Sequence, residues 1–341
     1  MKILNFKKLL LYYGIKIAVS YFCKNNLLMK KILFNICLTL PILSFAQNLQ
    51  IVPLGVYGGS NESNLSSYLV AEENSTDYLA LDGGTIYSGI NKAIEKGTFD
   101  VDNSKVLKDY IKGYFISHGH LDHLSGMIIN SPEDSSKPIY GIAEMIDVLK
   151  KKYFTNDAWA NFANEGEEPV LNKYYYKYAE VGKSFKIENT NLKGTIYELS
   201  HVNPLKSSAI LVENEESAII YFGDTGADRI EKSDKLATIW KALEPKIKYG
   251  KLKAMMLEVS FPNSQPEKLL FGHLTPSLMN EELKNLAKEV GQGRLKGMTI
   301  IVTHIKPKGD FEQKIKEELL KDNPYKINYI FPKQGERIIT K

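Results

Sequence analysis

The chain has 341 residues, with 44 Lys and Arg, 40 Asp and Glu, six histidines and two cysteines. Its formal net charge of +4 comes from residues 1–46, which hold seven lysines and no acid; the rest has 37 basic and 40 acidic residues, a net charge of −3. This excludes the basic surface expected of a protein that binds nucleic acid phosphates. Both cysteines, Cys23 and Cys37, lie in the same segment, so the remainder has neither disulfides nor thiolate metal ligands.

Residues 1–46 have the pattern of a signal peptide. From Met29, "MKK" leads into the apolar run "ILFNICLTLPILSF" and the small-residue site "SFA". We therefore expect Met29 to be the true start, with cleavage after Ala46 and export, so that the mature protein is periplasmic or secreted. The apolar run is shorter than the roughly 20 residues that span a bilayer, so we expect no membrane anchor in the mature form.

Residues 47–341 are expected to form one α/β domain, because no linker or shift in composition divides them. Strands are predicted at 50–57, 77–84, 111–118, 194–201, 208–224, 253–261 and 298–305, and helices at 86–97, 141–154, 229–244, 275–290 and 311–321. The segment at about 155–180, which contains "YYYKY", fits neither period and is interpreted as an insertion near the site. Buried strands alternating with helices predict layered sheets with a site along the strand ends.

The stretch "FISHGHLDHLSG" at 115–126 holds three of the six histidines. His118, His120 and Asp122 lie two residues apart where the predicted strand ends, so their side chains can converge on one side. His123 begins a helix and can reach a neighbouring point. Imidazole and carboxylate without thiolate suit Zn²⁺, Mn²⁺ or Fe, and the alternation of nitrogen and oxygen donors suits two ions close together.

Three further candidate ligands also follow predicted strands: His201 after "GTIYELS", Asp224 after "AIIYFG" and His304 after "MTIIVT". Alone, Asp224 in "GDTG" could be a turn or helix-cap residue. Placed between His201 and His304, it is the natural bridging carboxylate. A metal-binding module without catalysis stays open as an alternative, although structural sites are usually closed and this set leaves room for a water.

The order H-x-H-x-D-H, His, Asp, His resembles the metallo-β-lactamase fold superfamily. The resemblance implies an αββα sandwich with two mixed sheets flanked by helices. It further implies that His118, His120 and His201 hold one ion and that Asp122, His123 and His304 hold the other. Asp224 would bridge the two ions, for which Zn²⁺ is favoured and Mn²⁺ or Fe is an alternative.

Within that superfamily the chain resembles the class II 3′,5′-cyclic-nucleotide phosphodiesterases. The stretches that carry this resemblance are "NLSSYLV" at 64–70, "ISHGHLDHLSGMIINSP" at 116–132, "YFGDTGAD" at 221–228, "LEVSFPNS" at 257–264 with "GHLTP" at 272–276, and "VTHIKP" at 302–307. The resemblance implies hydrolysis of cyclic AMP, and of cyclic GMP as a further candidate, to the 5′-nucleotide. The partner would be this small molecule and not a nucleic acid; a homodimer is left open.

His273 is the histidine that the metal ligands leave unused. Its position after a glycine resembles that of the proton-donor histidine of tRNA 3′-processing nucleases, which implies that it protonates the leaving 3′-oxygen while a hydroxide generated by the two ions attacks phosphorus. The catalytic residues would then be His273, Asp122 and Asp224. A supporting or capping role for His273 is the alternative, and Glu258 and Thr303 are candidates for support of the ligands.

Two other hydrolases of the same superfamily remain as alternatives. A tRNA 3′-processing-type phosphodiesterase has the same ligands, but it calls for a basic RNA-binding surface that this chain lacks. A lactonase or lactamase needs the metal centre but has no evident use for the histidine of "GHLTP".

Overall fold

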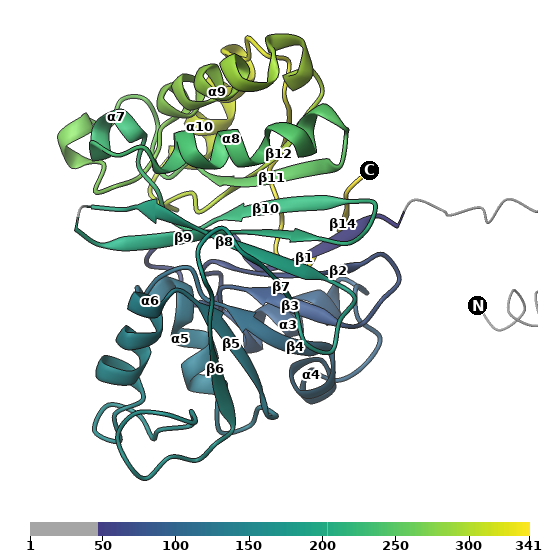
Figure 1. Ribbon diagram of the computed structural model, residues 1–341, viewed down its shortest axis with the longest axis vertical. Coiled ribbons are helices and arrows are strands. Elements are labelled where there is room, and N and C mark those ends of the chain that lie inside the picture. The colour runs from purple at the N-terminus through teal and green to yellow at the C-terminus, as the bar shows by residue number, and fades with distance from the viewer. Residues whose placement is uncertain (1–46, 203) are drawn as a thin grey trace, which may run out of the picture. The chain divides into compact units, whose positions relative to one another are not determined.

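Two seven-stranded sheets lie face to face, and helices cover the outer face of each (Figure 1). The first sheet has the order β14-β1-β2-β3-β4-β5-β6 and the second the order β13-β12-β11-β10-β9-β8-β7. Both sheets are mixed, with parallel pairs such as β3 with β4 and antiparallel pairs such as β1 with β2. This arrangement confirms the predicted αββα sandwich.

The computed structural model describes residues 47–202 and 204–341, which lie within one compact unit. The predicted signal peptide and its cleavage site at Ala46 fall outside these residues and stay predictions. Among the residues described, none of the helices is both long and apolar enough to cross a membrane.

The first half of the chain supplies six strands and the lower helices of Figure 1. In chain order its elements are β1 (Leu49–Gly55), β2 (Ser67–Glu72), β3 (Tyr78–Leu81), α3 (Tyr87–Glu95), α4 (Asn103–Lys105), η1 (Val106–Tyr110), β4 (Ile111–Phe115), α5 (Leu121–Asn130), β5 (Lys137–Gly141), α6 (Ala143–Val148), η2 (Leu149–Tyr153) and β6 (Tyr174–Tyr178).

The second half supplies the other sheet and the upper helices, and then returns one strand, β14, to the first sheet. Its elements are β7 (Ser184–Lys186), β8 (Lys193–Ser200), β9 (Lys206–Glu213), β10 (Ala218–Phe222), α7 (Asp228–Glu231), α8 (Lys235–Lys248), β11 (Leu252–Glu258), η3 (Glu267–Leu269), α9 (Pro276–Val290), η4 (Gln292–Leu295), β12 (Thr299–Thr303), α10 (Phe311–Lys321), β13 (Asn328–Ile330) and β14 (Ile338–Ile339).

The β10 strand shows why its apolar run is continuous. Ile219 and Tyr221 belong to the core cluster that includes the first sheet, whereas Ala218, Ile220 and Phe222 pack in the cluster under the outer helices. Successive side chains point to opposite faces, and both faces of this strand are covered. The strand is therefore fully buried along its length. Asp224, a candidate ligand, follows its end by two residues.

Three sequence predictions differ from the structure. The run at 208–224, predicted as one strand, forms two antiparallel strands, β9 and β10. The "YYYKY" stretch forms β6, the outermost strand of the first sheet, paired in parallel with β5. The helix predicted at 229–244 is divided into α7 and α8, because Lys232 adopts a left-handed conformation with φ of 53°. The carboxylate of Asp228 then accepts hydrogen bonds from the backbone N–H groups of Leu236 and Ala237, which stabilises the start of the second helix.

Candidate metal centre

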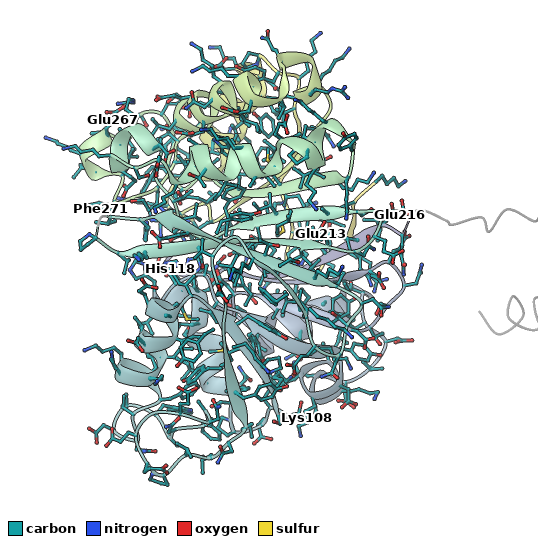
Figure 2. The ribbon with its side chains drawn as sticks, in the orientation of Figure 1. Lys108, His118, Glu213, Glu216, Glu267 and Phe271 are labelled. Atoms are coloured by element: carbon teal, nitrogen blue, oxygen red, sulfur yellow. The ribbon has the colours of Figure 1, made fainter. Side chains whose placement is uncertain are left out.

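The predicted site residues come together where strands of both sheets end. His118 and the start of α5 follow β4 of the first sheet, and His201, Asp224 and His304 follow β8, β10 and β12 of the second. Because β10, β11 and β12 run parallel, their carboxyl ends lie along one edge. Figure 2 shows His118 between the upper and lower layers of the sandwich, toward this edge.

Two groups of side chains have ligand atoms within 4.8 Å of one another: His118, His120, His201 and Asp224 in one, and Asp122, His123 and His304 in the other. These seven residues are the ones that the sequence singled out. A third group joins Asp224 and His304 to His273, so the sixth histidine lies beside the same centre.

Asp224 faces both groups, one carboxylate oxygen toward each. Its Oδ2 lies 3.7 Å from Nε2 of His118 and 3.8 Å from Nε2 of His201. Its Oδ1 lies 3.2 Å from Nε2 of His123 and 3.2 Å from Nε2 of His304. A carboxylate in this position can contribute one oxygen to each of two cations.

The buried donor atoms fit a metal. The Nδ1 atom of His118 is 3.0 Å from Ser117 Oγ, and Nδ1 of His201 donates to the carbonyl oxygen of Gly272 at 2.9 Å. The Nε2 atoms of both rings are buried and have no hydrogen-bond partner within the described ranges. The same is true of Oδ1 of Asp224. Since buried polar atoms without partners destabilise a fold, a cation beside Asp224 Oδ2 would satisfy both Nε2 atoms, and positive charge on the side of His123 and His304 would satisfy Oδ1.

The protonation states of the first group also favour a cation. Burial, and then the neighbouring His123, hold the pKa of His118 well below its ordinary value. Burial, followed by the proximity of His201, lowers the pKa of His120 to about 4. Burial lowers the pKa of His201 too. These imidazoles are therefore neutral at pH 7, which is the form that binds a metal.

Asp82, which was not a candidate from the sequence, lies behind His123 and orients its ring. Its Oδ2 accepts a hydrogen bond from Nδ1 of His123 at 2.6 Å, and its carboxylate also accepts from the Ser117 N–H, the Ser117 hydroxyl and the Tyr221 hydroxyl. A carboxylate behind a metal-binding histidine fixes the tautomer and leaves Nε2 for the metal. Burial lowers the pKa of His123, but the negative charges of Asp224 and Asp82 raise the pKa by more, so that it lies well above its ordinary value. These carboxylates therefore favour positive charge at this position.

Asp122 and His304 are aligned by the chain around them. The backbone N–H of Gly59, in the loop between β1 and β2, donates to Oδ2 of Asp122 at 2.8 Å. His304 adopts a left-handed conformation with φ of 58°, and its Nδ1 is 3.0 Å from the Ser260 hydroxyl. Lys306, which was not a candidate from the sequence either, places its ammonium nitrogen 3.8 Å from Asp122 Oδ2 at the edge of the centre.

His273 is held by a carboxylate, as His123 is, but it lies outside the two groups of candidate ligands described above. Its Nδ1 is 2.8 Å from Oε1 of Glu258, and its ring lies between those of His201 and His304, at centroid distances of 5.0 and 5.1 Å. Burial lowers its pKa, but Glu258 and Asp224 raise the pKa by more. Glu258, suggested as a support from the sequence, is therefore in contact with the site, whereas the buried hydroxyl of Thr303 has no hydrogen-bond partner in the part of the chain described.

The family model of the class-II cAMP phosphodiesterases matches residues 45–321. A 3′,5′-cyclic-nucleotide phosphodiesterase of Aliivibrio fischeri is 42% identical over 301 residues, covering 84% of this chain and 91% of that protein. The chain belongs to the class-II cAMP phosphodiesterase family. This membership confirms the resemblance seen in the sequence motifs.

Solved structures bear out the fold of this class-II family member. The crystal structure of unliganded yeast PDE1 superposes with a TM-score of 0.76 at 22% identity, covering 86% of this chain and 100% of that one. A metallo-β-lactamase fold protein, YhfI from Bacillus subtilis, gives a TM-score of 0.57 at 16% identity, covering 86% and 99%. The class-II chain therefore has the metallo-β-lactamase fold, and it carries a His/Asp cluster suited to metal binding.

Proposed function

We propose that the protein hydrolyses 3′,5′-cyclic nucleotides, cyclic AMP first and cyclic GMP as a second substrate, to 5′-nucleotides. The observation that carries this proposal is the arrangement around Asp224, which faces two groups of ligand atoms while His273 stands beside both. The similarity to named cyclic-nucleotide phosphodiesterases supports it further.

The centre is proposed to hold two divalent cations, most favourably Zn²⁺, with Mn²⁺ or Fe as alternatives. His118, His120 and His201 would hold one, Asp122, His123 and His304 the other, and Asp224 would bridge them. When bound, such a pair lowers the pKa of a shared water and offsets charge on the phosphoryl oxygens. The absence of cysteine among residues 47–341 supports ligation by nitrogen and oxygen alone.

His273 is proposed to donate a proton to the 3′-oxygen as the phosphorus–oxygen bond breaks. Hydrogen bonding of Nδ1 to Glu258 leaves Nε2 available to the substrate. The carboxylates of Glu258 and Asp224 favour the charged imidazolium, which is the state a general acid requires. Glu258 would act through His273 as a positioning residue.

One purified sample tests the proposal against its alternatives. Turnover of cyclic AMP, bis(p-nitrophenyl) phosphate, a β-lactam and a lactone is compared, and the nucleotide product is identified by chromatography. We expect cyclic AMP to give 5′-AMP and the lactam and lactone to be left intact. Release of 3′-AMP, or no cleavage of cyclic nucleotides with metal present, would refute the proposal.

Export is a separate proposal. The leader pattern from Met29 to Ala46 supports a mature protein that begins at Gln47 and acts in the periplasm or outside the cell. Whether the protein is a homodimer is decided by light scattering of the purified protein.

A further inference from the structure

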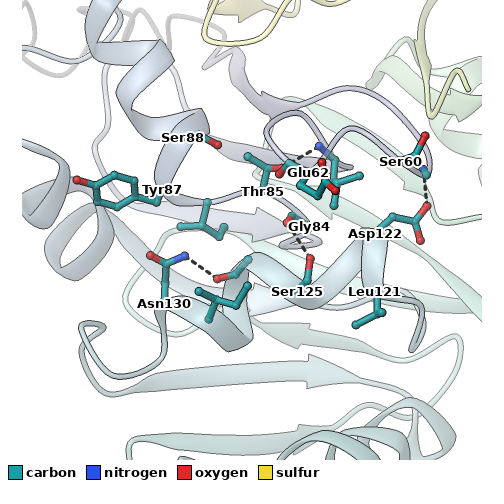
Figure 3. Close-up of a pocket in the computed structure, with 15 residues that line it drawn as sticks. Ser60, Glu62, Gly84, Thr85, Tyr87, Ser88, Leu121, Asp122, Ser125 and Asn130 are labelled. Carbon is teal, nitrogen blue, oxygen red and sulfur yellow. Dashed lines mark hydrogen bonds between the residues drawn. The ribbon is translucent and has the colours of Figure 1, made fainter. Parts of the chain in front are cut away.

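A groove runs away from the metal centre along one side of α5 (Figure 3). It is a cavity of about 640 Å³ between that helix, the loop that joins β1 to β2 and the loop that joins β3 to α3. Ser60 and Glu62 come from the first loop, Thr85 and Tyr87 from the second, and Leu121 and Ile129 from the helix.

The groove is continuous with the metal centre at Asp122, which lines both. Asp122, Ser125 and Ile129 stand at i, i+3 and i+7 of α5, so they share one face of the helix. At the same end, Gly59 lines the groove and donates its N–H to the Asp122 carboxylate. Lys306 is also at this end, since a β-carbon placed on Gly59 would lie 3.6 Å from its Nζ atom.

The walls of the groove are apolar and exposed. Tyr87 is 58% exposed, Leu121 61% and Ile129 62%, although all three line a concave surface. At the far end the side-chain N–H₂ of Asn130, a lining residue, donates to the Gly126 carbonyl, and its amide oxygen accepts no hydrogen bond from the residues described (Figure 3). An apolar slot with a few polar groups at its edge suits a planar heteroaromatic ring.

The dimensions agree with this chemistry. Asp122 and Asn130 are eight residues apart, which at 1.5 Å per residue is about 12 Å along the helix. That length is comparable with the distance from the phosphate of a nucleotide to the far edge of a purine. A phosphate beside Asp122 and Lys306 would thus place an attached base near Tyr87 and Ile129, toward Asn130.

We propose that this groove binds the nucleobase of the cyclic nucleotide, with Tyr87 and Ile129 in contact with the ring and the Asn130 amide oxygen accepting a hydrogen bond from it. This inference rests on the proposed function. It assigns a binding site to the nucleobase, the part of the substrate that the metal centre does not hold. Tyr87 and Ile129 are then specificity residues that do not touch the reacting atoms.

The test compares cyclic AMP with the same cyclic phosphate lacking a base, 1-deoxyribose 3′,5′-cyclic phosphate. Tyr87→Ala and Ile129→Ser should each raise KM for cyclic AMP about tenfold or more, the worth of a buried apolar side chain, and leave kcat within twofold. Neither variant should alter kcat/KM for the base-free substrate. Truncation at these positions removes no side-chain hydrogen bond that the structure records, so folding should be retained.

Leu320→Ser is the matched control, because Leu320 is 65% exposed on α10 and remote in sequence from the groove. It should leave both substrates unaffected. If the unaltered protein cleaves cyclic AMP while both groove variants keep its KM, the groove assignment is wrong and the proposed function stands. Equal losses on both substrates would also overturn the assignment, since the effect would then come from the metal centre. Failure of the unaltered protein on cyclic AMP would refute the function and the groove together.

Discussion

Oε1 of Glu258 lies 2.8 Å from Nδ1 of His273, and both side chains are buried beside the metal centre. The imidazoles of His118, His201 and His304 instead pair with a hydroxyl or a backbone carbonyl through Nδ1. His123 also pairs with a carboxylate, that of Asp82, but it belongs to one of the two groups of candidate ligands, whereas His273 lies outside both. A carboxylate behind the ring stabilises the charged imidazole, which suits proton donation.

Replacing His273 with Ala should leave two metals bound and reduce cyclic AMP turnover by about 10² to 10⁴, the usual effect of a positioned general acid. With a nitrophenolate leaving group, which needs no proton, the variant should recover much of this loss. Steady-state kinetics on both substrates and metal analysis of the same sample provide the measurement.

Glu258→Gln is the companion variant, expected to give a smaller loss with the same dependence on the leaving group. An His273→Ala protein that lost metal, or lost equal rate on both substrates, would show His273 to be a ligand or a positioning residue.

Replacing His120 with Ala should lower metal content and turnover together, because one ion loses a direct ligand. His120 is the exposed member of the first group, so its removal leaves no buried cavity and the fold should be retained. Elemental analysis and circular dichroism of the variant check both parts. Full metal content in an inactive variant would argue against ligation by His120.

Asp82→Asn should weaken metal binding by about 10- to 100-fold, because the carboxylate that orients His123 loses its charge while its shape is kept. Competition with a chelator measures the change. Tyr221→Phe is the control: it removes one hydrogen bond to the same carboxylate and leaves the contact with His123. Similar losses in both variants would assign the effect of Asp82 to packing.

Protein recovered from its native host should begin at or near Gln47, as expected for cleavage after Ala46. Amino-terminal sequencing or mass spectrometry decides this. A mature form that keeps Lys30 and Lys31 would contradict export by this leader.

The convergence of the candidate ligands could be predicted because each candidate is visible locally in the sequence. His118, His120, Asp122 and His123 are close in sequence, and His201, Asp224 and His304 directly follow short apolar runs that favour strands. Their neighbours could not be found this way. Asp82 reaches His123 across 41 residues, and in the sequence "LDGG" it has the pattern of an ordinary turn. The contact between the Gly272 carbonyl and His201 depends on the backbone alone.

The β6 strand was missed for a related reason. Its alternation is present, since Tyr174 and Tyr176 are buried while Tyr175 and Lys177, on the other face, are only partly buried. However, tyrosine occupies both kinds of position, so the sequence shows no contrast between the two faces. Hydrogen bonds from the hydroxyls of Tyr114 and Tyr174 to the buried carboxylate of Asp134 make that side of β6 an interior face.

The candidate ligands around Asp224 come from both halves of the sandwich. His118, His120, Asp122 and His123 follow β4 of the first sheet, whereas His201, Asp224 and His304 follow β8, β10 and β12 of the second. His123 and His304, whose Nε2 atoms are 3.0 Å apart, are separated by 181 positions in the chain. A cation held between them would act as a cross-link between the sheets, and its binding free energy would add to the free energy of unfolding. Removal of the cation would therefore lower the free energy of unfolding as well as abolish catalysis.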